Sequence, residues 1–394
     1  MIDFTITRLP QIHFGRGKIA TAIPLAANYG KRLLLVTGKQ TFDTGNFKDQ
    51  LLQQCEQHQM FLLQVKIESE PSPKLIDEIV TQYKSEKIDV VLGIGGGSAL
   101  DAAKAIAGLL KLDNSVMDFL EGVGPELTYN GPSIPFIAAP TTAGTGSEAT
   151  KNSVLSHIAN DGFKKSFRDE KLVAQHAIID PALLESCPVD IIAANGMDAL
   201  TQLIESYVSI KANVFTDSLA LPAIELVRDS LLTWYEDGQF AKTAQDNMAY
   251  AAMISGITLA QVGLGSVHGL ASPIGAFFEI PHGVVCGTLL SSATKINIDA
   301  MLERDPSNPA LTKYANLANI LCQKEFSDRS KAFQELIAML ESWTHKLQLK
   351  RLNEYQISEE DLDKITKNSR GSSMKTNPIV LTDEEIKTIL KLRF

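Results

Sequence analysis

The chain has 394 residues, of which 44% are hydrophobic and 21% are charged, and its formal net charge is −9. This length predicts two domains, with enough apolar residues for a core in each. An acidic balance without a basic block argues against nucleic acid or an anionic membrane as a partner. No apolar run reaches the length of a bilayer span, and the first residues lack the pattern of a signal peptide. The 4 cysteines are scattered, so we expect reduced thiols in a cytoplasmic protein.

Strands and helices alternate through the first half of the chain. The apolar runs 32–37, 61–67, 88–94 and 135–139 are typical of buried parallel strands, and 73–84 has the periodicity of an amphipathic helix. This alternation predicts a parallel sheet with helices on both faces. Ligands of such sheets bind at the carboxyl ends of the strands.

A run of three glycines follows the strand predicted at 88–94 and opens a helix predicted over 99–110. Glycine leaves the backbone bare, and the free N–H groups and dipole of a helix N-terminus favour a pyrophosphate. We expect Ser98 to cap this helix and Asp101 to complete a box-like arrangement. Nucleotide binding is the favoured interpretation, with an ordinary strand-to-helix turn as the alternative, since the G-x-G-x-x-G fingerprint is absent. The turn consists of Gly95, Gly96, Gly97 and Ser98.

A second polar loop, residues 140–148, follows the strand predicted at 135–139. Its hydroxyl groups and glycines stand just after a strand end, where they suit contacts with phosphate and ribose. Taken alone, the same composition also fits a plain polar loop.

The pattern becomes helical after Asp180-Pro181, where we place the boundary between an α/β domain (1–180) and an all-helical domain (181–394). Apolar residues recur with helical periodicity over 198–210, 217–236, 244–262, 285–301, 309–323, 329–345 and 383–392. Residues 302–308 and 367–379 are expected to be loops, and the charged segment 346–364 is expected to be a solvated face.

One carboxylate and two histidines in the helical half form a candidate site for a divalent metal. Asp198 follows Asn195-Gly196 and is predicted to lie in the first turn of a helix, while His268 and His282 flank an apolar helical segment. This donor set suits Zn²⁺ or Fe²⁺. Each residue also has a structural explanation, because Asp198 can be a helix-start acid and a histidine can be a satisfied core residue.

Four motifs stand in a characteristic order: GGGSALDAAK (95–104), PTTAGTGSE (140–148), NGMDAL (195–200) and HGLASPIGAFFEIPHG (268–283). In these motifs and their spacing the chain resembles the iron-containing (group III) alcohol dehydrogenases, over essentially its whole length. The resemblance implies an α/β N-terminal dinucleotide-binding domain with a parallel sheet and an all-α C-terminal domain, the dehydroquinate synthase-like architecture. It also implies a metal in the cleft that faces the nicotinamide.

The activity implied by the resemblance is that of an NAD(P)-linked alcohol dehydrogenase or aldehyde reductase acting on a small alcohol or aldehyde. Hydride would pass between the nicotinamide and the carbon bearing oxygen, with the metal as Lewis acid. At least a homodimer is implied as well. The residues implied to be catalytic are Asp198, His268, His282 and Lys164. The expected cofactor-binding residues come from the loop after strand 32–37, from the glycine turn and its helix, and from the polar loop and the residues that follow it. They are Gly38, Lys39, Gly95, Gly96, Gly97, Ser98, Asp101, Thr141, Thr142, Thr145, Ser147 and Asn152.

The chain departs from the family pattern at two positions. Four residues after Asp198 the family has a histidine ligand, and this chain has Gln202, a poorer ligand than imidazole. Four residues after His268 the family often has a second histidine, and here stands Ser272. Three alternatives stay open: a metal held by Asp198, His268 and His282 with water or Gln202; a weakly bound metal; or no metal, as in the maleylacetate reductase branch.

Cofactor preference depends on the residues after strand 32–37. NAD-preferring relatives often carry an aspartate there, which repels a 2′-phosphate, whereas this chain has Gly38, Lys39 and Gln40. Without an acid and with an adjacent cation, we expect NADP(H) to be favoured over NAD(H).

Two other classes of function compete with the dehydrogenase. A dehydroquinate synthase-like lyase would need several basic residues for an acidic substrate, but the second-half motifs are apolar at Ala271, Ile274 and Phe277. A catalytically silent nucleotide-binding scaffold is the other alternative, suggested by the loss of two histidines.

Overall fold

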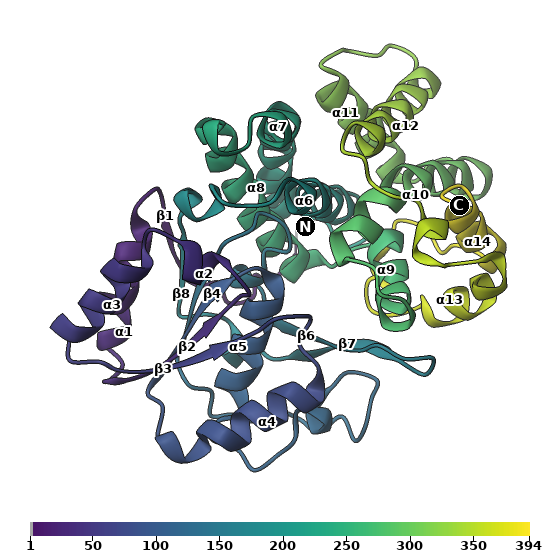
Figure 1. Cartoon of the computed structure of the whole chain (residues 1–394). Coiled ribbons are helices and arrows are strands. Elements are labelled where there is room, and N and C mark those ends of the chain that lie inside the picture. The colour runs from purple at the N-terminus through teal and green to yellow at the C-terminus, as the bar shows by residue number, and fades with distance from the viewer. Residues whose placement is uncertain (1–2) are drawn as a thin grey trace.

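The computed structural model describes residues 3–394 and has an α/β region next to a helical region (Figure 1). Every strand of the described chain precedes Asp180, and helices and short turns of 3₁₀ helix follow it. The predicted fold class, a parallel sheet followed by an all-helical part, is therefore confirmed.

The main sheet has six parallel strands in the order β1 (Gln11–Phe14), β8 (His176–Ile179), β5 (Phe136–Pro140), β4 (Val90–Gly95), β2 (Arg32–Thr37) and β3 (Phe61–Lys66). All four strands predicted from apolar runs are present. The sequence did not single out β1, a short edge strand with mostly exposed residues, or β8, a buried strand of only four residues.

Register aligns the carboxyl ends of the central strands. Thr37 pairs with Ile94, and Gly95 pairs with Pro140. The chain leaving β2 stays close, since the Gly38 N–H donates to the Ile94 carbonyl at 3.1 Å. The glycine turn and the polar loop predicted to bind a nucleotide therefore lie at one edge of the sheet.

Helices cover both faces of the sheet. Alternate residues of a strand point to opposite faces, and over residues 33–36 of β2 both sets of side chains are apolar and buried. Leu33 and Leu35 pack in a core with α1 (Ala22–Ala27) and α3 (Lys48–Gln57), and Leu34 and Val36 pack in another with α4 (Pro73–Tyr83) and α5 (Gly97–Leu109). The short α2 (Thr41–Thr44) follows β2. As predicted, Pro73 begins α4, and Ser72 caps it by accepting a hydrogen bond from the Leu75 N–H at 3.2 Å.

A two-stranded antiparallel hairpin, β6 (Asn152–His157) and β7 (Phe163–Arg168), leaves the main sheet and contacts α5 and α9 (Figure 1). The sequence did not single it out, since its strands carry few consecutive apolar residues. The hairpin brings Lys164 to the helical region.

The helical region comprises α6 (Val189–Val208), α7 (Val214–Asp237), α8 (Lys242–Val262), α9 (Ser266–Phe277), α10 (His282–Arg304), α11 (Pro309–Cys322), α12 (Arg329–Lys346), α13 (Leu362–Asn368) and α14 (Asp383–Lys391). The helix α6 is buried along most of its length and packs on α7, α8 and α10. Two predicted loops were partly wrong, because α10 continues to Arg304 and a turn of 3₁₀ helix spans Met374–Thr376. The charged segment 346–364 is not wholly solvated, since Leu352 and Ile357 are buried in it.

The predicted start of the helix at Asp198 was wrong. α6 begins at Val189, so Asp198 lies in its interior and is not a helix-start acid. Gly196, which suggested a helix boundary, is instead a close-packing position. A Cβ there would lie 2.2 Å from Leu231 Cδ1 on α7.

Within residues 3–394, no single helix has the length and apolar composition that a membrane span requires. The helices α8 and α9 meet those two criteria only as a pair, and the pair is bent by 99°.

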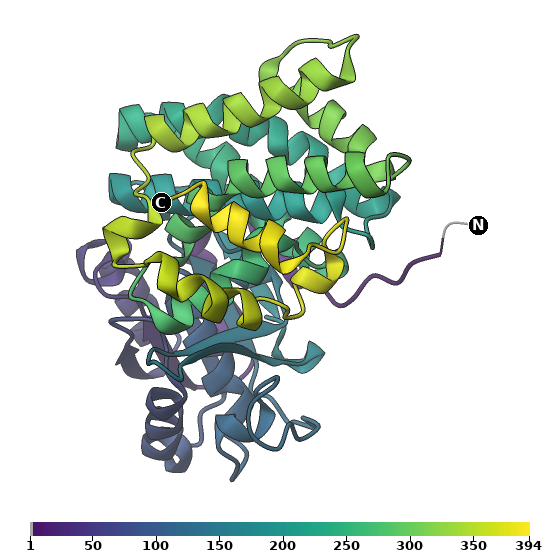
Figure 2. The ribbon, with the colours of Figure 1, turned by 90° about the vertical axis from the view of Figure 1, so that its right-hand side faces the viewer.

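The first described residues form an extended segment that projects from the body of the molecule (Figure 2). It is held at the helical region, where the Thr7 N–H donates to Gln261 Oε1 at 2.8 Å. The edge strand β1 follows it.

The two regions touch through backbone at Gly146 and Gly256. Gly146, in the loop after β5, has φ of 60°, and a Cβ at Gly256 on α8 would lie 2.2 Å from the Gly146 carbonyl oxygen. Neither backbone can give way cheaply, so both positions require glycine.

Gly256→Ala is expected to lower the free energy of unfolding by about 1–3 kcal/mol or more, because the added methyl overpacks this contact. Chemical denaturation measures the change. The control is Gly371→Ala, where a Cβ meets nothing within 4 Å. Equal stability of the two variants would contradict the assigned contact.

Candidate functional site

The glycine turn between β4 and α5 is built as an open helix N-terminus. Gly96 is the N-cap residue, and no side chain accepts from the first free amides of α5. A Cβ at Gly97 would lie 2.9 Å from the Thr145 side chain, so glycine lets the loop after β5 approach the helix. Gly96, Gly97 and Ser98 are partly exposed. These amides are available to an anion.

The predicted cap was wrong. Ser98 lies inside the first turn of α5, because the helix already begins at Gly97. Asp101 does not complete a capping box, since its carboxylate accepts hydrogen bonds from the Ser147 hydroxyl and from the Val154 N–H. Its role in the structure is to tie α5 to the loop after β5 and to β6.

The expected cofactor-binding residues gather around this turn. The Thr141 N–H donates to the Gly95 carbonyl at 3.0 Å, and a Cβ on Gly96 would lie 3.3 Å from Thr142 Oγ1. Lys39, after β2, is exposed. Asn152 begins β6 on the other side.

A buried lysine that the sequence analysis left without a role holds the polar loop in shape. Lys104 is 0% exposed, and its ammonium donates to the Ser147 carbonyl at 2.9 Å, the Thr150 hydroxyl at 3.0 Å and the Asn152 carbonyl. Burial lowers the pKa of Lys104, and Asp101 opposes this effect. The GGGSALDAAK motif contains this lysine, but only the fold reveals its partners.

A carboxylate, two imidazoles and a thiol meet in the helical region. Asp198 from α6, His268 from α9, and His282 and Cys286 from α10 each offer one ligand atom, and these atoms all lie within 4.8 Å of one another. The distance from His268 Nε2 to Asp198 Oδ1 is 3.2 Å, and that from His282 Nε2 to the same oxygen is 3.9 Å. The structure thus brings together the three residues that the sequence singled out.

Glu205, which the sequence analysis missed, orients His268. Its two carboxylate oxygens accept from the Val267 N–H and pair with His268 Nδ1, both at 2.7 Å. Glu205 lies seven residues after Asp198, so both project from one face of α6. Fixing Nδ1 leaves Nε2 aimed at the cluster, the arrangement common for a metal-binding histidine.

The surroundings of the cluster are negative. Burial alone lowers the pKa of His268, but the neighbouring Cys286, Asp198 and Glu205 outweigh it, so this pKa lies well above its usual value. Burial lowers the pKa of His282 to about 4, against the opposing effect of Asp198. Burial also raises the pKa of the Cys286 thiol to about 12.

The donor set fits a divalent cation. Asp198 Oδ2 and His282 Nδ1 are buried and have no hydrogen-bond partner among the residues that the structure describes. A buried carboxylate oxygen without a partner is costly, and a cation bound beside it removes that cost. Carboxylate, imidazole and thiolate are ligands of Zn²⁺ and Fe²⁺.

The two positions that depart from the family pattern have other surroundings that the structure defines. Gln202 is buried, and its Oε1 accepts a hydrogen bond from the Ser255 hydroxyl at 2.7 Å. Ser272, on α9, is exposed.

Lys164 reaches α9 from the hairpin. Its ammonium forms an ion pair with Glu70 at 2.7 Å, and the Ser156 hydroxyl donates to the same carboxylate at 2.7 Å. Burial would raise the pKa of Glu70, but Lys164 and the hydrogen bonds lower it overall. A Cβ at Gly275 would lie 3.4 Å from Lys164 Cδ, so the lysine packs on the helix that carries His268.

The predicted nucleotide loop (residues 140–148, after β5) and the ligand cluster (Asp198, His268, His282 and Cys286) are neighbours. A Cβ at Gly144 would lie 2.7 Å from Asn195 Cβ on α6, and Asn195 precedes Asp198 by three residues, about one helical turn. The loop after β5 therefore lies against α6 beside the carboxylate. Together they form one candidate site at the junction of the two regions.

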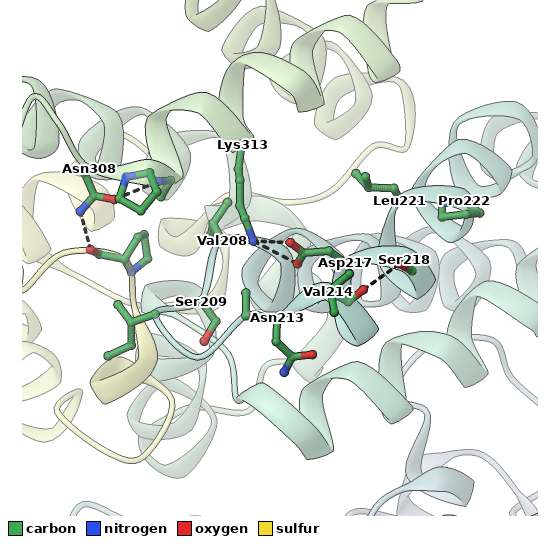
Figure 3. Close-up of a pocket in the computed structure, with 15 residues that line it drawn as sticks. Val208, Ser209, Asn213, Val214, Asp217, Ser218, Leu221, Pro222, Asn308 and Lys313 are labelled. Carbon is green, nitrogen blue, oxygen red and sulfur yellow. Dashed lines mark hydrogen bonds and ion pairs between the residues drawn. The ribbon is translucent and has the colours of Figure 1, made fainter. Parts of the chain in front are cut away.

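A separate hollow of about 880 Å³ lies between the end of α6, the start of α7 and α11 (Figure 3). Lys313 spans it in an ion pair with Asp217 at 2.7 Å. Its lining contains none of the candidate site residues. The lining residue Val208 is ten positions from Asp198, about 15 Å along α6.

Two family models match the chain. Residues 10–181 match the model described as iron-containing alcohol dehydrogenase, and residues 192–394 match that of the Fe-containing alcohol dehydrogenase family, C-terminal. The NADPH-dependent butanol dehydrogenase of Clostridium saccharobutylicum is 30% identical over 404 residues, 99% of this chain and 97% of that protein. The NAD-dependent methanol dehydrogenase of Bacillus methanolicus is 29% identical over 386 residues, 97% of each.

The crystal structure of the archaeal halo-thermophilic Red Sea brine pool alcohol dehydrogenase ADH/D1 has the same fold. It superposes with a TM-score of 0.91 at 26% identity, covering 100% of this chain and 99% of that one. The family models and the relatives place the chain among the oxidoreductases. The chain belongs to the iron-containing alcohol dehydrogenase family. Membership supports alcohol dehydrogenase activity and implies a nicotinamide cofactor, a divalent metal and a small alcohol or aldehyde as substrate.

Lys104→Met is expected to lower the free energy of unfolding by about 3–5 kcal/mol, since it removes the cation that pairs with the Asp101 carboxylate and the donor to several buried acceptors. Thermal and chemical denaturation measure the loss. The matched control is Lys74→Met on the surface of α4, where the side chain is 85% exposed and a change within about 0.5 kcal/mol is expected. A similarly small effect at Lys104 would contradict its assigned role.

Proposed function

We propose that the chain is a metal-dependent dehydrogenase that interconverts a small alcohol and its aldehyde with a nicotinamide cofactor. The observation that carries this proposal is the cluster of Asp198, His268 and His282 beside the loop after β5. An anion-accepting helix terminus next to a divalent-cation cluster suits a dinucleotide whose reactive ring faces the metal. Residues 1–180 would bind the dinucleotide, and residues 181–394 would supply the metal ligands.

The proposed cofactor site follows from the turn and loop geometry. The backbone N–H groups of Gly96, Gly97 and Ser98 would donate hydrogen bonds to the pyrophosphate. Thr142 and Thr145 lie beside them. Gly38 and Lys39 would border the adenosine ribose at the end of β2, which pairs with β4. Asp101, Ser147 and Asn152 would support the loop through their bonds to α5 and Lys104.

The proposed metal ligands are Asp198, His268 and His282. When bound, a divalent metal polarises a carbonyl or lowers the pKa of an alcohol, and the nicotinamide gives or takes hydride. Glu205 keeps His268 Nδ1 paired and so directs Nε2 to the metal position. Lys164, which lies beside α9, would be close to the substrate. Its ion pair with Glu70 would hold the positive charge of its ammonium group in place there.

The cation after β2 supports a preference for NADP(H). Lys39 is exposed, and the chain has no acid at Gly38, Lys39 or Gln40 to repel a 2′-phosphate. Opposite charges at such a surface attract by about 1 kcal/mol or more, depending on solvent exposure.

The ratio of kcat/KM for NADPH over NADH is expected to exceed one in the unaltered enzyme. Lys39→Asp should lower that ratio by about tenfold, since it replaces attraction to the 2′-phosphate with repulsion. Lys111→Asp, an exposed lysine at the end of α5, serves as the charge control. An unaltered enzyme that favours NADH would show that this loop does not select the cofactor.

Metal dependence is the decisive test of the chemistry. Removing metal with a chelator is expected to abolish aldehyde reduction, and added Fe²⁺ or Zn²⁺ should restore it. Asp198→Asn should lower metal affinity by more than about a hundredfold, since even the loss of outer residues costs about 10–100-fold. Asp190→Asn, at the exposed start of the same helix, should leave affinity unchanged. Full activity with no bound metal would instead assign the chain to a metal-independent mechanism.

We also propose that the chain forms a homodimer or a higher homo-oligomer. The edge strand β1 pairs with β8 on one side only, and Ile12 and Phe14 on it are 37% and 38% exposed. An open strand edge with exposed apolar residues favours pairing with a second copy. Light scattering coupled to size exclusion measures the mass in solution.

A further inference from the structure

We propose that Cys286 is the fourth protein ligand of the metal, which makes the site an aspartate, two histidines and a thiolate. This inference deepens the proposed function, since it rests on that function for the presence of a divalent metal. It assigns the role of the missing family histidine to a different helix. Gln202, at the histidine's position, is not needed as a ligand.

The distances from the Cys286 sulfur to the two imidazoles match a tetrahedral site. Cys286 Sγ lies 3.6 Å from His268 Nε2 and 3.7 Å from His282 Nε2. Tetrahedral bonds of about 2.0–2.1 Å to nitrogen and about 2.3 Å to sulfur separate the two ligand atoms by about 3.5 Å. The sulfur therefore already stands near the spacing that a shared metal requires.

The helix α10 explains why the sulfur points at the cluster. His282 is its first residue and Cys286 follows four positions later, so both side chains project from the same face. Cys286 is 0% exposed, and its sulfur lies close to the two imidazoles and to the Asp198 carboxylate. A helix that positions His282 must position Cys286 as well.

Gln202 is the less suitable fourth ligand. Its Oε1 already accepts a hydrogen bond from the Ser255 hydroxyl at 2.7 Å, and Ser255 also contacts the Gly144 carbonyl of the nucleotide loop. One of the two lone pairs of Oε1 is therefore already used within the protein. The Cys286 sulfur, by contrast, belongs to the group of four ligand atoms that lie within 4.8 Å of one another.

The thiolate changes the charge balance of the site. When the metal binds, the Cys286 S–H bond breaks, its proton passes to solvent and the sulfur binds as the anion. Asp198 and Cys286 together then neutralise a divalent cation, whereas a site with three histidines keeps a positive charge. Since thiolate is a soft ligand, it favours retention of Zn²⁺ over Fe²⁺.

The test uses full-length protein, stripped of metal with a chelator and reloaded with Co²⁺. The unaltered protein is expected to give a near-ultraviolet charge-transfer band from sulfur to cobalt. Cys286→Ser should lose this band and bind Co²⁺ at least about tenfold more weakly. Cys322→Ser, which removes a partly exposed thiol on α11, should retain both the band and the affinity.

A second measurement needs no variant. X-ray absorption of the Zn²⁺-loaded, unaltered protein should require one sulfur at about 2.3 Å beside nitrogen and oxygen ligands. It decides the question if Cys286→Ser does not fold.

Two adverse outcomes are distinguishable. Stoichiometric Co²⁺ and Zn²⁺ binding without the band and with only nitrogen and oxygen neighbours would overturn the thiolate ligand and leave the proposed function standing. Failure of the unaltered protein to bind either ion would overturn both.

Discussion

The structure depends on carboxylates buried inside a helical core. Asp198 and Glu205 project from one face of α6 into surroundings that are almost wholly dry. Such groups are tolerated only when donors or a cation compensate them. Glu205 is compensated by the Val267 N–H and by His268, which fixes the start of α9. Within residues 3–394, Asp198 has one oxygen near the imidazoles and one oxygen without a hydrogen-bond partner, which the proposed cation would compensate.

The α/β region meets this helical core through positions without side chains. Gly144 lies against Asn195 on α6, and Gly146 lies against Gly256 on α8 at distances that exclude a Cβ. Backbone contacts of this kind cannot slide without steric clash, so they fix the distance between the nucleotide loop and the ligand cluster. Lys104 stiffens the same loop from within the α/β region. In the proposed dehydrogenase, close packing rather than flexible side chains would position the two reactants for hydride transfer.

The departures from the family pattern form a consistent chemical picture. At Gln202 and Ser272 the chain lacks two basic groups that the family pattern has, and Cys286 adds a thiol to the cluster of Asp198, His268 and His282. The polar partners of Gln202 show that its side chain joins the packing between α6 and α8 instead. A less basic site with more room beside α9 fits an uncharged substrate better than an acidic one. This agrees with the small alcohols named for the relatives.

Sequence alone determined what depends on local pattern. Apolar runs gave four strands of the sheet, periodicity gave most helices, and short motifs gave the glycine turn and the residues Asp198, His268 and His282. What depends on contacts between distant segments was decided only by the tertiary structure. Gly196 suggested a helix boundary and proved to be a packing contact with Leu231. The edge strand β1, the partners of Lys104 and the meeting of Cys286 with His268 required the fold, because these contacts join residues that lie far apart in the sequence.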